Sequence, residues 1–145
     1  MLNNNRIYCI EGYASVFNVV DRSNEIIRKG AFLSQNYIPG DIKLLWQHDI
    51  TSPVGLVSSI IEDNFGLFIS AEIIFNTNLA LEAKSLVETS VIDSLSIGFV
   101  SEEEKCNSMG QNEILKAKLY EISLVTFGSN PMAKITYSYP IKKQR

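Results

Sequence analysis

Apolar and polar residues alternate with a period of two along most of this chain, and glycine or asparagine separates the alternating segments. This pattern is typical of a mainly antiparallel β protein. Strands are predicted over residues 6–17, 25–28, 53–62, 67–74, 94–102 and 113–127, with another through His48 after the turn at Pro39-Gly40-Asp41. The segments 53–62 and 67–74 are expected to pair as a hairpin around the polar turn at 63–66.

Helix is the minority, and one full helix is predicted. It starts near Thr77 or Asn78, either of which can cap it, and finishes near Ser90. Its apolar residues form one stripe, made of Leu79, Ala83, Leu86 and Val87. A short helical turn is also expected at Gly30. Several strands, one crossover helix and a single core together predict a closed or nearly closed antiparallel β-barrel, which leaves no exposed sheet edge.

Length and composition limit the classes of protein to which the chain can belong. With 145 residues, 46% of them hydrophobic, it fits one domain spanning 1–145 that needs no disulfide or metal to form a core. Cys9 and Cys106 lie far apart with no histidine near either, so we expect free thiols and no metal site or cofactor. The acidic run 102–104 is expected to be a solvated strand end.

Charge and hydropathy bear on partners and location. A net charge of −3 and a pI near 5.2 argue against a nucleic-acid binder, which normally has a concentrated basic face. The basic residues Lys142, Lys143 and Arg145 are expected to be a solvated terminus. No apolar segment approaches the length of a membrane span, and the first residues lack a signal-peptide pattern. A soluble, cytoplasmic protein is therefore expected.

His48 is the only histidine in the chain, and an extended backbone would place it on the same face as Leu44 and Trp46. Its unperturbed pKa of about 6.5 allows histidine to exchange protons near neutral pH. His48 is therefore a candidate general base. The alternative is a hydrogen-bonded residue of the core.

Two other segments offer groups that could act with a histidine. Ser94, Ser96 and Gly98 share a small, polar strand face, where a substrate carbonyl could approach a hydroxyl to within about 3–3.5 Å. The alternative is a strand packed closely against another backbone. Glu121 lies in an apolar row and needs a partner, because burying an unpaired carboxylate costs several kcal/mol. That partner could be an imidazole, backbone amides, or a lysine or arginine in a structural ion pair.

Four blocks of sequence, in the same order, resemble the prohead maturation proteases of tailed bacteriophages, a family of serine peptidases. The blocks are Gly12-Tyr13-Ala14 with Lys29-Gly30-Ala31-Phe32, Leu45-Trp46-Gln47-His48-Asp49 with Pro53-Val54-Gly55, Leu95-Ser96-Ile97-Gly98-Phe99, and Glu121-Ile122-Ser123-Leu124-Val125-Thr126-Phe127 with Asn130-Pro131. The resemblance spans most of the chain. It implies a barrel fold like that of assemblin, the herpesvirus capsid protease.

The resemblance also implies roles for individual residues. Ser96 becomes the nucleophile, His48 the general base, and Glu121 the third member that orients the imidazole. Asp49 is the rival for the third position, although a residue adjacent to His48 on a strand would point to the opposite face. By analogy with assemblin, the backbone amides of Gly128 and Ser129 are candidates for the oxyanion hole.

Two positions depart from the family pattern. Ser94 stands where glycine is usual, and Gly128 stands where proline is common. Neither departure removes a reacting group, but both bear on how tightly the site is preorganised.

The implied function is a serine endopeptidase that acts inside the assembling prohead in the host cytoplasm. Its substrates would be the major capsid protein or scaffold protein, with its own chain as a further candidate, and a homo-oligomer stays open. The alternative is a catalytically silent barrel that assists capsid assembly, with His48, Ser96 and Glu121 as a buried polar network. A Ser96 that lies in a groove within hydrogen-bond reach of His48 would favour the enzyme.

Overall fold

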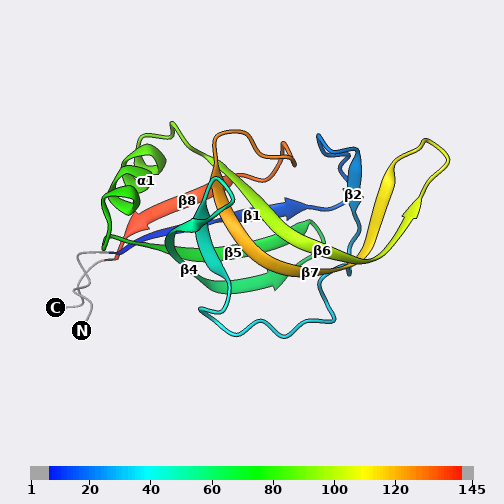
Figure 1. Cartoon of the computed structure of the whole chain (residues 1–145), viewed down its shortest axis with the longest axis horizontal. Coiled ribbons are helices and arrows are strands. Elements are labelled where there is room, and N and C mark those ends of the chain that lie inside the picture. The colour runs from blue at the N-terminus through cyan, green and yellow to red at the C-terminus, as the bar shows by residue number, and fades with distance from the viewer. Residues whose placement is uncertain (1–6, 142–145) are drawn as a thin grey trace.

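The structure is a computed structural model that describes residues 7–141. It contains eight strands and one helix (Figure 1). In chain order these are β1 (Ile7–Val16), β2 (Glu25–Ile27), β3 (Lys43–Trp46), β4 (Asp49–Glu62), β5 (Gly66–Ile74), α1 (Asn78–Glu88), β6 (Ser94–Cys106), β7 (Asn112–Val125) and β8 (Ile135–Pro140). A mainly β fold is confirmed. Arg6, Lys142, Lys143 and Arg145 lie outside the described residues.

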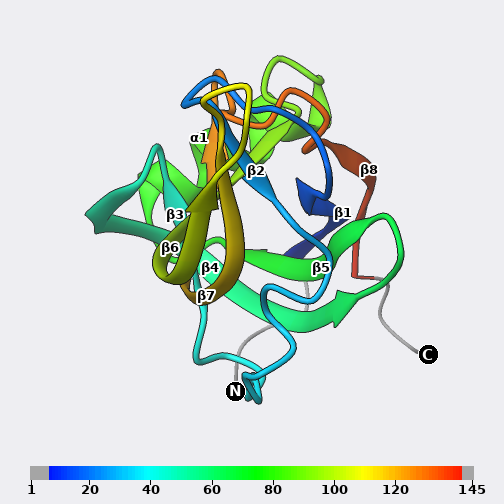
Figure 2. The ribbon, with the colours of Figure 1, turned by 90° about the vertical axis from the view of Figure 1, so that its right-hand side faces the viewer.

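All eight strands belong to one sheet, in the order β2-β7-β3-β4-β5-β1-β8, with β6 paired to β7 as well. The prediction of an antiparallel sheet is wrong in part. The sheet is mixed, because β2 and β3 both run parallel to β7. It curls strongly, so that β3, β6 and β7 face β1 and β8 across the interior (Figure 2). Within residues 7–141, β6 joins the β8 side only through an isolated bridge between Ser94 and Lys134.

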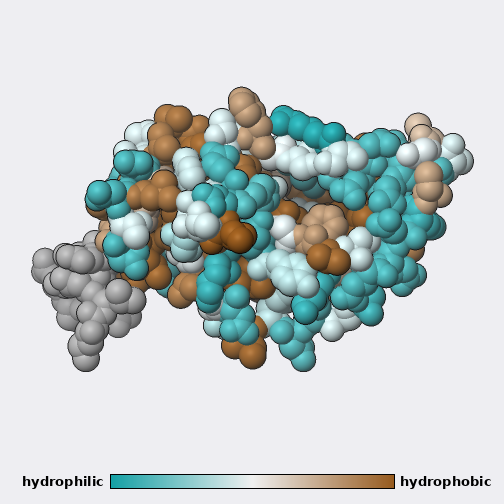
Figure 3. Space-filling view, viewed as in Figure 1, coloured by the Kyte–Doolittle hydropathy of each residue, from teal (hydrophilic) through white to brown (hydrophobic). Residues whose placement is uncertain are grey.

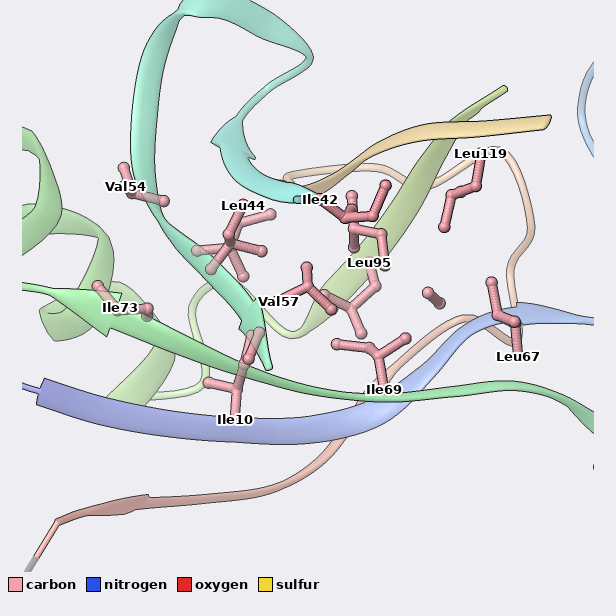
Figure 4. Close-up of a cluster of buried hydrophobic side chains, with 14 of the residues drawn as sticks. Ile10, Ile42, Leu44, Val54, Val57, Leu67, Ile69, Ile73, Leu95 and Leu119 are labelled. Atoms are coloured by element: carbon pink, nitrogen blue, oxygen red, sulfur yellow. The ribbon is translucent and has the colours of Figure 1, made fainter. Parts of the chain in front are cut away.

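The core fills the inside of this curled sheet. Ile10, Leu44, Val57, Ile69 and Leu95 come from five different strands and converge there with at most 2% of their surface exposed (Figure 4). Apolar residues at alternate positions supply this inner face, as the period of two predicts. The core therefore fixes β3 and β6, two of the strands that carry the site.

The helix and the central hairpin agree with the predictions from sequence. Thr77 caps α1 by accepting a hydrogen bond from the Ala80 amide at 3.1 Å. Of the predicted apolar stripe, Ala83 and Val87 are buried, whereas Leu79 and Leu86 are only partly buried against the core. The third buried residue of α1 is Ala80, which was not predicted. The β4–β5 hairpin turns where expected, although β4 begins earlier, at Asp49. At Gly30, where a short helical turn was expected, the described chain makes consecutive hydrogen-bonded turns, one of them from the Leu33 amide to the Gly30 carbonyl at 3.2 Å.

Other boundaries differ from those predicted. β6 continues to Cys106, so Glu102–104 lie exposed within a strand rather than beyond its end. β6 and β7 there form an arm at one end of the molecule, whose surface is largely hydrophilic (Figures 1 and 3). β7 stops at Val125, which leaves Phe127 80% exposed outside the strand. β8, which pairs with β1, was not predicted.

Candidate active site

His48 lies in a two-residue turn between β3 and β4, so its predicted place on a strand face is wrong. Trp46 and Asp49 pair across the turn, and Gln47 and His48 have φ angles of 54° and 60°. Two positive φ angles are those of a type I′ hairpin turn, for which Asn-Gly is the usual sequence. The left-handed region costs about 1–2 kcal/mol for other residues. The surrounding structure must therefore hold this turn in place.

The end of β7 supplies that support. The Gln47 amide donates to the Leu124 carbonyl oxygen at 2.9 Å. The Gln47 side chain donates to Thr126 Oγ1 at 2.7 Å and accepts from the Thr126 amide at 3.2 Å. These three bonds fasten the turn to the end of β7 and to the residue that follows it.

Ser96 and Glu121 come from paired strands. In the β6–β7 register Ser96 lies opposite Ser123, and Gly98 lies opposite Glu121. Ser96 and Glu121 are therefore diagonal neighbours on one face, whose Cα atoms are typically about 7–8 Å apart. Between these two described residues no direct side-chain hydrogen bond is formed, and each bonds instead to an imidazole that stands between them.

The ring of His48 occupies that position. Its Nε2 lies 2.9 Å from Ser96 Oγ, and its Nδ1 lies 2.5 Å from Glu121 Oε1. Because an ionised carboxylate only accepts hydrogen bonds, Nδ1 carries the proton and Nε2 is left to accept from the Ser96 hydroxyl. The hydrogen bond to Glu121 raises the pKa of His48 above 6.5, while partial burial opposes this effect.

The other residues that the sequence offered for this site do not take part in the hydrogen-bonded row. Among residues 7–141 no lysine or arginine forms an ion pair with Glu121. Asp49 accepts hydrogen bonds from Thr51 and Ser52 of its own strand. The hydroxyl of Ser94 donates to Asp93 at 2.9 Å and accepts from Lys134 at 2.9 Å. The structure thus brings together Ser96, His48 and Glu121, and leaves Asp49 and Ser94 outside.

A pocket of about 170 Å³ opens beside Ser96 and His48. Ser96 is only 8% exposed, but it lines this pocket and can be reached from it. The lining also includes Asp21, Glu25 and Phe99. A substrate could therefore reach the Ser96–His48 pair from this side.

The two oxyanion-hole candidates lie close to this pocket in different ways. Ser129 lines it, whereas Gly128 is buried with its Cα side facing the Leu95 carbonyl. A Cβ at Gly128 would lie 3.0 Å from that oxygen. In the described part of the chain neither backbone amide donates a hydrogen bond to the protein.

Four residues that hold the site together were assigned no supporting role from the sequence. Ser123 and Gly98 lie opposite Ser96 and Glu121, and Gln47 and Thr126 hold the turn. The period-two row through Glu121 contains Ser123 and could have indicated it. The unusual turn at Gln47 could not be recognised, because nothing in Leu-Trp-Gln-His-Asp resembles a hairpin turn sequence.

Within 7–141, no three or more His, Cys, Asp or Glu side chains are grouped as a metal ion requires. No helix in the same range is long and apolar enough to cross a membrane.

Comparison with known protein families adds to this geometry. The model of the Caudovirus prohead serine protease family matches residues 1–144. The chain belongs to this family. The resemblance predicted from the four sequence blocks is therefore confirmed.

One relative by sequence is the prohead protease of Enterobacteria phage HK97, which is 30% identical over 131 residues. The match covers 86% of the present chain but 57% of the relative, so this chain spans little more than half of the relative's length. The activity of the whole relative is therefore not assigned to this chain from the match alone.

Solved structures show that the fold is shared with a bacteriophage capsid assembly protease and with herpesvirus proteases. The capsid assembly protease of bacteriophage T4 matches with a TM-score of 0.59 at 12% identity, covering 81% of this chain and 80% of that one. KSHV protease, in complex with a hexapeptide phosphonate inhibitor, gives a TM-score of 0.55 at 15% identity, covering 90% and 64%. Varicella-zoster virus protease gives 0.56 at 15% identity, covering 89% and 63%.

Proposed function

We propose that this protein is a serine endopeptidase of phage prohead maturation that cleaves capsid or scaffold protein, with its own chain as a further candidate substrate. The observation that carries the proposal is the hydrogen-bonded row Ser96–His48–Glu121 in a member of a serine protease family. The relatives support the setting, since one is a prohead protease and another a capsid assembly protease.

Each member of the row has a role in acyl transfer. His48 Nε2 takes the proton of Ser96 while Oγ attacks the carbonyl carbon of the scissile peptide bond. Glu121 holds the Nδ1 proton and stabilises the imidazolium. That imidazolium then protonates the leaving amine, and water, activated by the same ring, hydrolyses the acyl-enzyme.

The tetrahedral intermediate needs donors for its oxyanion. The amides of Gly128 and Ser129 are our candidates, because both are free in the described chain and lie next to the strand that carries Ser96. Preorganised amides of this kind are worth about a hundredfold to a thousandfold in turnover.

Confinement explains how such an enzyme could be controlled. Inside a prohead the protease and its capsid or scaffold substrates would share a small volume, which gives a high effective concentration. A site with modest intrinsic affinity would then act only after assembly.

A silent assembly barrel is the competing function. A buried polar network held only for structure would not need a pocket at the hydroxyl that lies within hydrogen-bond reach of the histidine. The pocket beside Ser96 and the 2.9 Å contact to His48 therefore favour the enzyme.

We infer in addition that the curled sheet is a nearly closed barrel. The Leu95 amide donates to the Ala133 carbonyl at 3.1 Å, and the Ile135 amide donates to the Asp93 carbonyl at 2.8 Å. These bonds would tie the strand of the nucleophile to the β8 side. Slow hydrogen exchange at both amides would support closure, and rapid exchange at both would refute it.

Co-expression with the capsid and scaffold proteins of the same phage tests the function. Wild-type protein should convert one of these proteins to a shorter product, Ser96→Ala should not, and a chelator should change nothing. Cleavage that persists undiminished with purified Ser96→Ala protein would refute the proposal. Loss of cleavage with chelator, restored by zinc, would also refute it.

A further inference from the structure

The hydroxyl of Ser123 links two members of the candidate site. Its Oγ donates to Glu121 Oε2 at 2.7 Å and accepts from the backbone amide of His48 at 3.1 Å. A hydroxyl has one hydrogen to donate and two lone pairs. The single hydrogen is donated to the carboxylate of Glu121, and one lone pair accepts the backbone N–H of His48 in the turn.

The position of Ser123 in the sheet places it on the strand of Glu121 and next to the strands that carry Ser96 and the His48 turn. It lies on β7 two residues after Glu121, opposite Ser96 on β6 and opposite Leu45 on the parallel strand β3. Its side chain has no exposed surface. Contact with solvent therefore does not explain why this position is a serine. Ser123 also does not line the pocket beside Ser96.

A serine at a fully buried position needs a reason for its hydroxyl. An alanine would fit the same space, but it would leave Glu121 Oε2 without its donor and the His48 amide without its acceptor. Buried polar groups left unpaired are costly. The hydroxyl thus serves the acid and the base together.

Holding both carboxylate oxygens has a geometric consequence. Oε1 of Glu121 receives the imidazole Nδ1–H while Oε2 receives the Ser123 hydroxyl. With both oxygens bonded, the carboxylate cannot rotate about its last torsion, which is otherwise broad for glutamate. The bond to the His48 amide fixes the left-handed turn from which the imidazole extends.

We propose that Ser123 is a positioning residue for catalysis, which fixes the carboxylate of Glu121 and the backbone of His48 in one hydrogen-bonded unit. This inference rests on the proposed roles of Ser96, His48 and Glu121. Ser123 touches no reacting atom and acts through its two neighbours.

The inference predicts how catalysis changes when the hydroxyl is removed. In Ser123→Ala the carboxylate is free to turn away, so kcat should fall about tenfold to a hundredfold, as is usual when supporting hydrogen bonds are lost. KM should stay within about twofold because Ser123 does not line the pocket. The midpoint of the pH–rate profile should move down, since Glu121 then supports the imidazolium less well.

Ser101→Ala is the matched control. Ser101 lies on β6, the strand paired with the β7 strand of Ser123, and its buried hydroxyl has no hydrogen-bond partner in the described chain. Its removal deletes the same atom without touching the site, so kcat, KM and the pH midpoint should match wild type.

The test measures kcat, KM and the pH–rate midpoint with a peptide that spans the cleavage site mapped for the wild-type enzyme, together with melting temperature. Ser123→Ala is also combined with Glu121→Gln, and the double variant should be little slower than Glu121→Gln alone because the two residues act as one unit. A structural role would instead lower the melting temperature and leave kcat and the pH midpoint of the folded fraction unchanged.

The outcomes separate this inference from the proposed function. If wild type cleaves in a Ser96-dependent way and Ser123→Ala keeps normal kcat and pH midpoint, the positioning role is wrong while the protease stands. If no cleavage depends on Ser96, the proposed function itself fails. Should Ser123→Ala not fold, Ser123→Cys keeps the size with a weaker donor and must still reduce kcat and lower the midpoint. Wild-type values for Ser123→Cys would then overturn the positioning role.

Discussion

Gly98 makes room for the carboxylate of Glu121. The two residues are direct partners across β6 and β7, and a Cβ built on Gly98 would lie 2.8 Å from Cγ and 2.9 Å from Cδ of Glu121. Real Cβ atoms essentially never approach other heavy atoms so closely. The glycine is therefore required by the side chain opposite it, which places Glu121 beside the imidazole of His48.

Replacing Gly98 with alanine should damage turnover more than stability. The methyl group would push the flexible end of Glu121 away from His48, so we expect kcat to fall at least about a hundredfold, as when a triad acid is displaced. Kinetics with a peptide substrate and a melting curve measure the two effects.

Gly55→Ala is the contrasting variant. A Cβ at Gly55 would meet the backbone of Glu72 on β5, including its carbonyl carbon at 2.8 Å. A backbone cannot swing aside as a side chain can, so this variant should lower the melting temperature instead. Normal kcat in Gly98→Ala would contradict the proposed role of Glu121.

The raised pKa of His48 predicts opposite pH trends for activity and stability. Only neutral imidazole can accept the Ser96 proton, so kcat/KM should rise with pH, with a midpoint above 6.5. Because the folded pKa lies above the unfolded one, the stabilisation from His48 is fully present below about pH 6.5 and is lost as pH rises through the folded pKa.

Two measurements examine this linkage. A pH–rate profile gives the midpoint, and urea unfolding between about pH 5.5 and 8.5 gives the free energy of unfolding. The decline in that free energy across the window should be present in wild type and absent in His48→Ala. An activity midpoint at or below 6.5 would show that Glu121 does not support the imidazolium.

Glu121→Gln and Asp49→Asn distinguish the two carboxylates proposed from sequence. The amide in Glu121→Gln keeps the shape but loses the charge and can present a donor to Nδ1, so turnover should fall by about two to four orders of magnitude. The carboxylate of Asp49 accepts hydrogen bonds only from Thr51 and Ser52 in the described chain, and Asp49→Asn should stay within about threefold of wild type. A slow Asp49→Asn beside an active Glu121→Gln would reverse the assignment.

Local sequence patterns were sufficient for much of this fold. The β4–β5 hairpin and α1 were predictable because their signals lie within a few residues: a polar turn between apolar arms, and Thr77 before an apolar stripe. The parallel pairing of β3 with β7 was not predictable, since it joins residues about 78 positions apart (Lys43 with Glu121). β8 escaped because Ile135–Pro140 is a half-exposed edge strand with a weak pattern.

The candidate site divides in the same way. Ser96 and Glu121 could be placed on strand faces by counting in twos, and the structure puts them on adjacent strands as that counting allows. His48 could not, because its position depends on a turn with two positive φ angles that bonds to β7 fasten in place. The identity of the residue was evident from the sequence, but the backbone that carries it was not.

Covalent labelling with a fluorophosphonate tests the central claim most directly, because the reagent requires an activated serine and no knowledge of the natural substrate. Peptide mass spectrometry of wild-type protein should find the adduct on Ser96. The adduct should be lost in Ser96→Ala, slowed by orders of magnitude in His48→Ala, and unaffected in Ser94→Ala, whose hydroxyl bonds to Asp93 and Lys134. Labelling of another serine in wild type, or equal labelling of Ser96 in His48→Ala, would contradict the account.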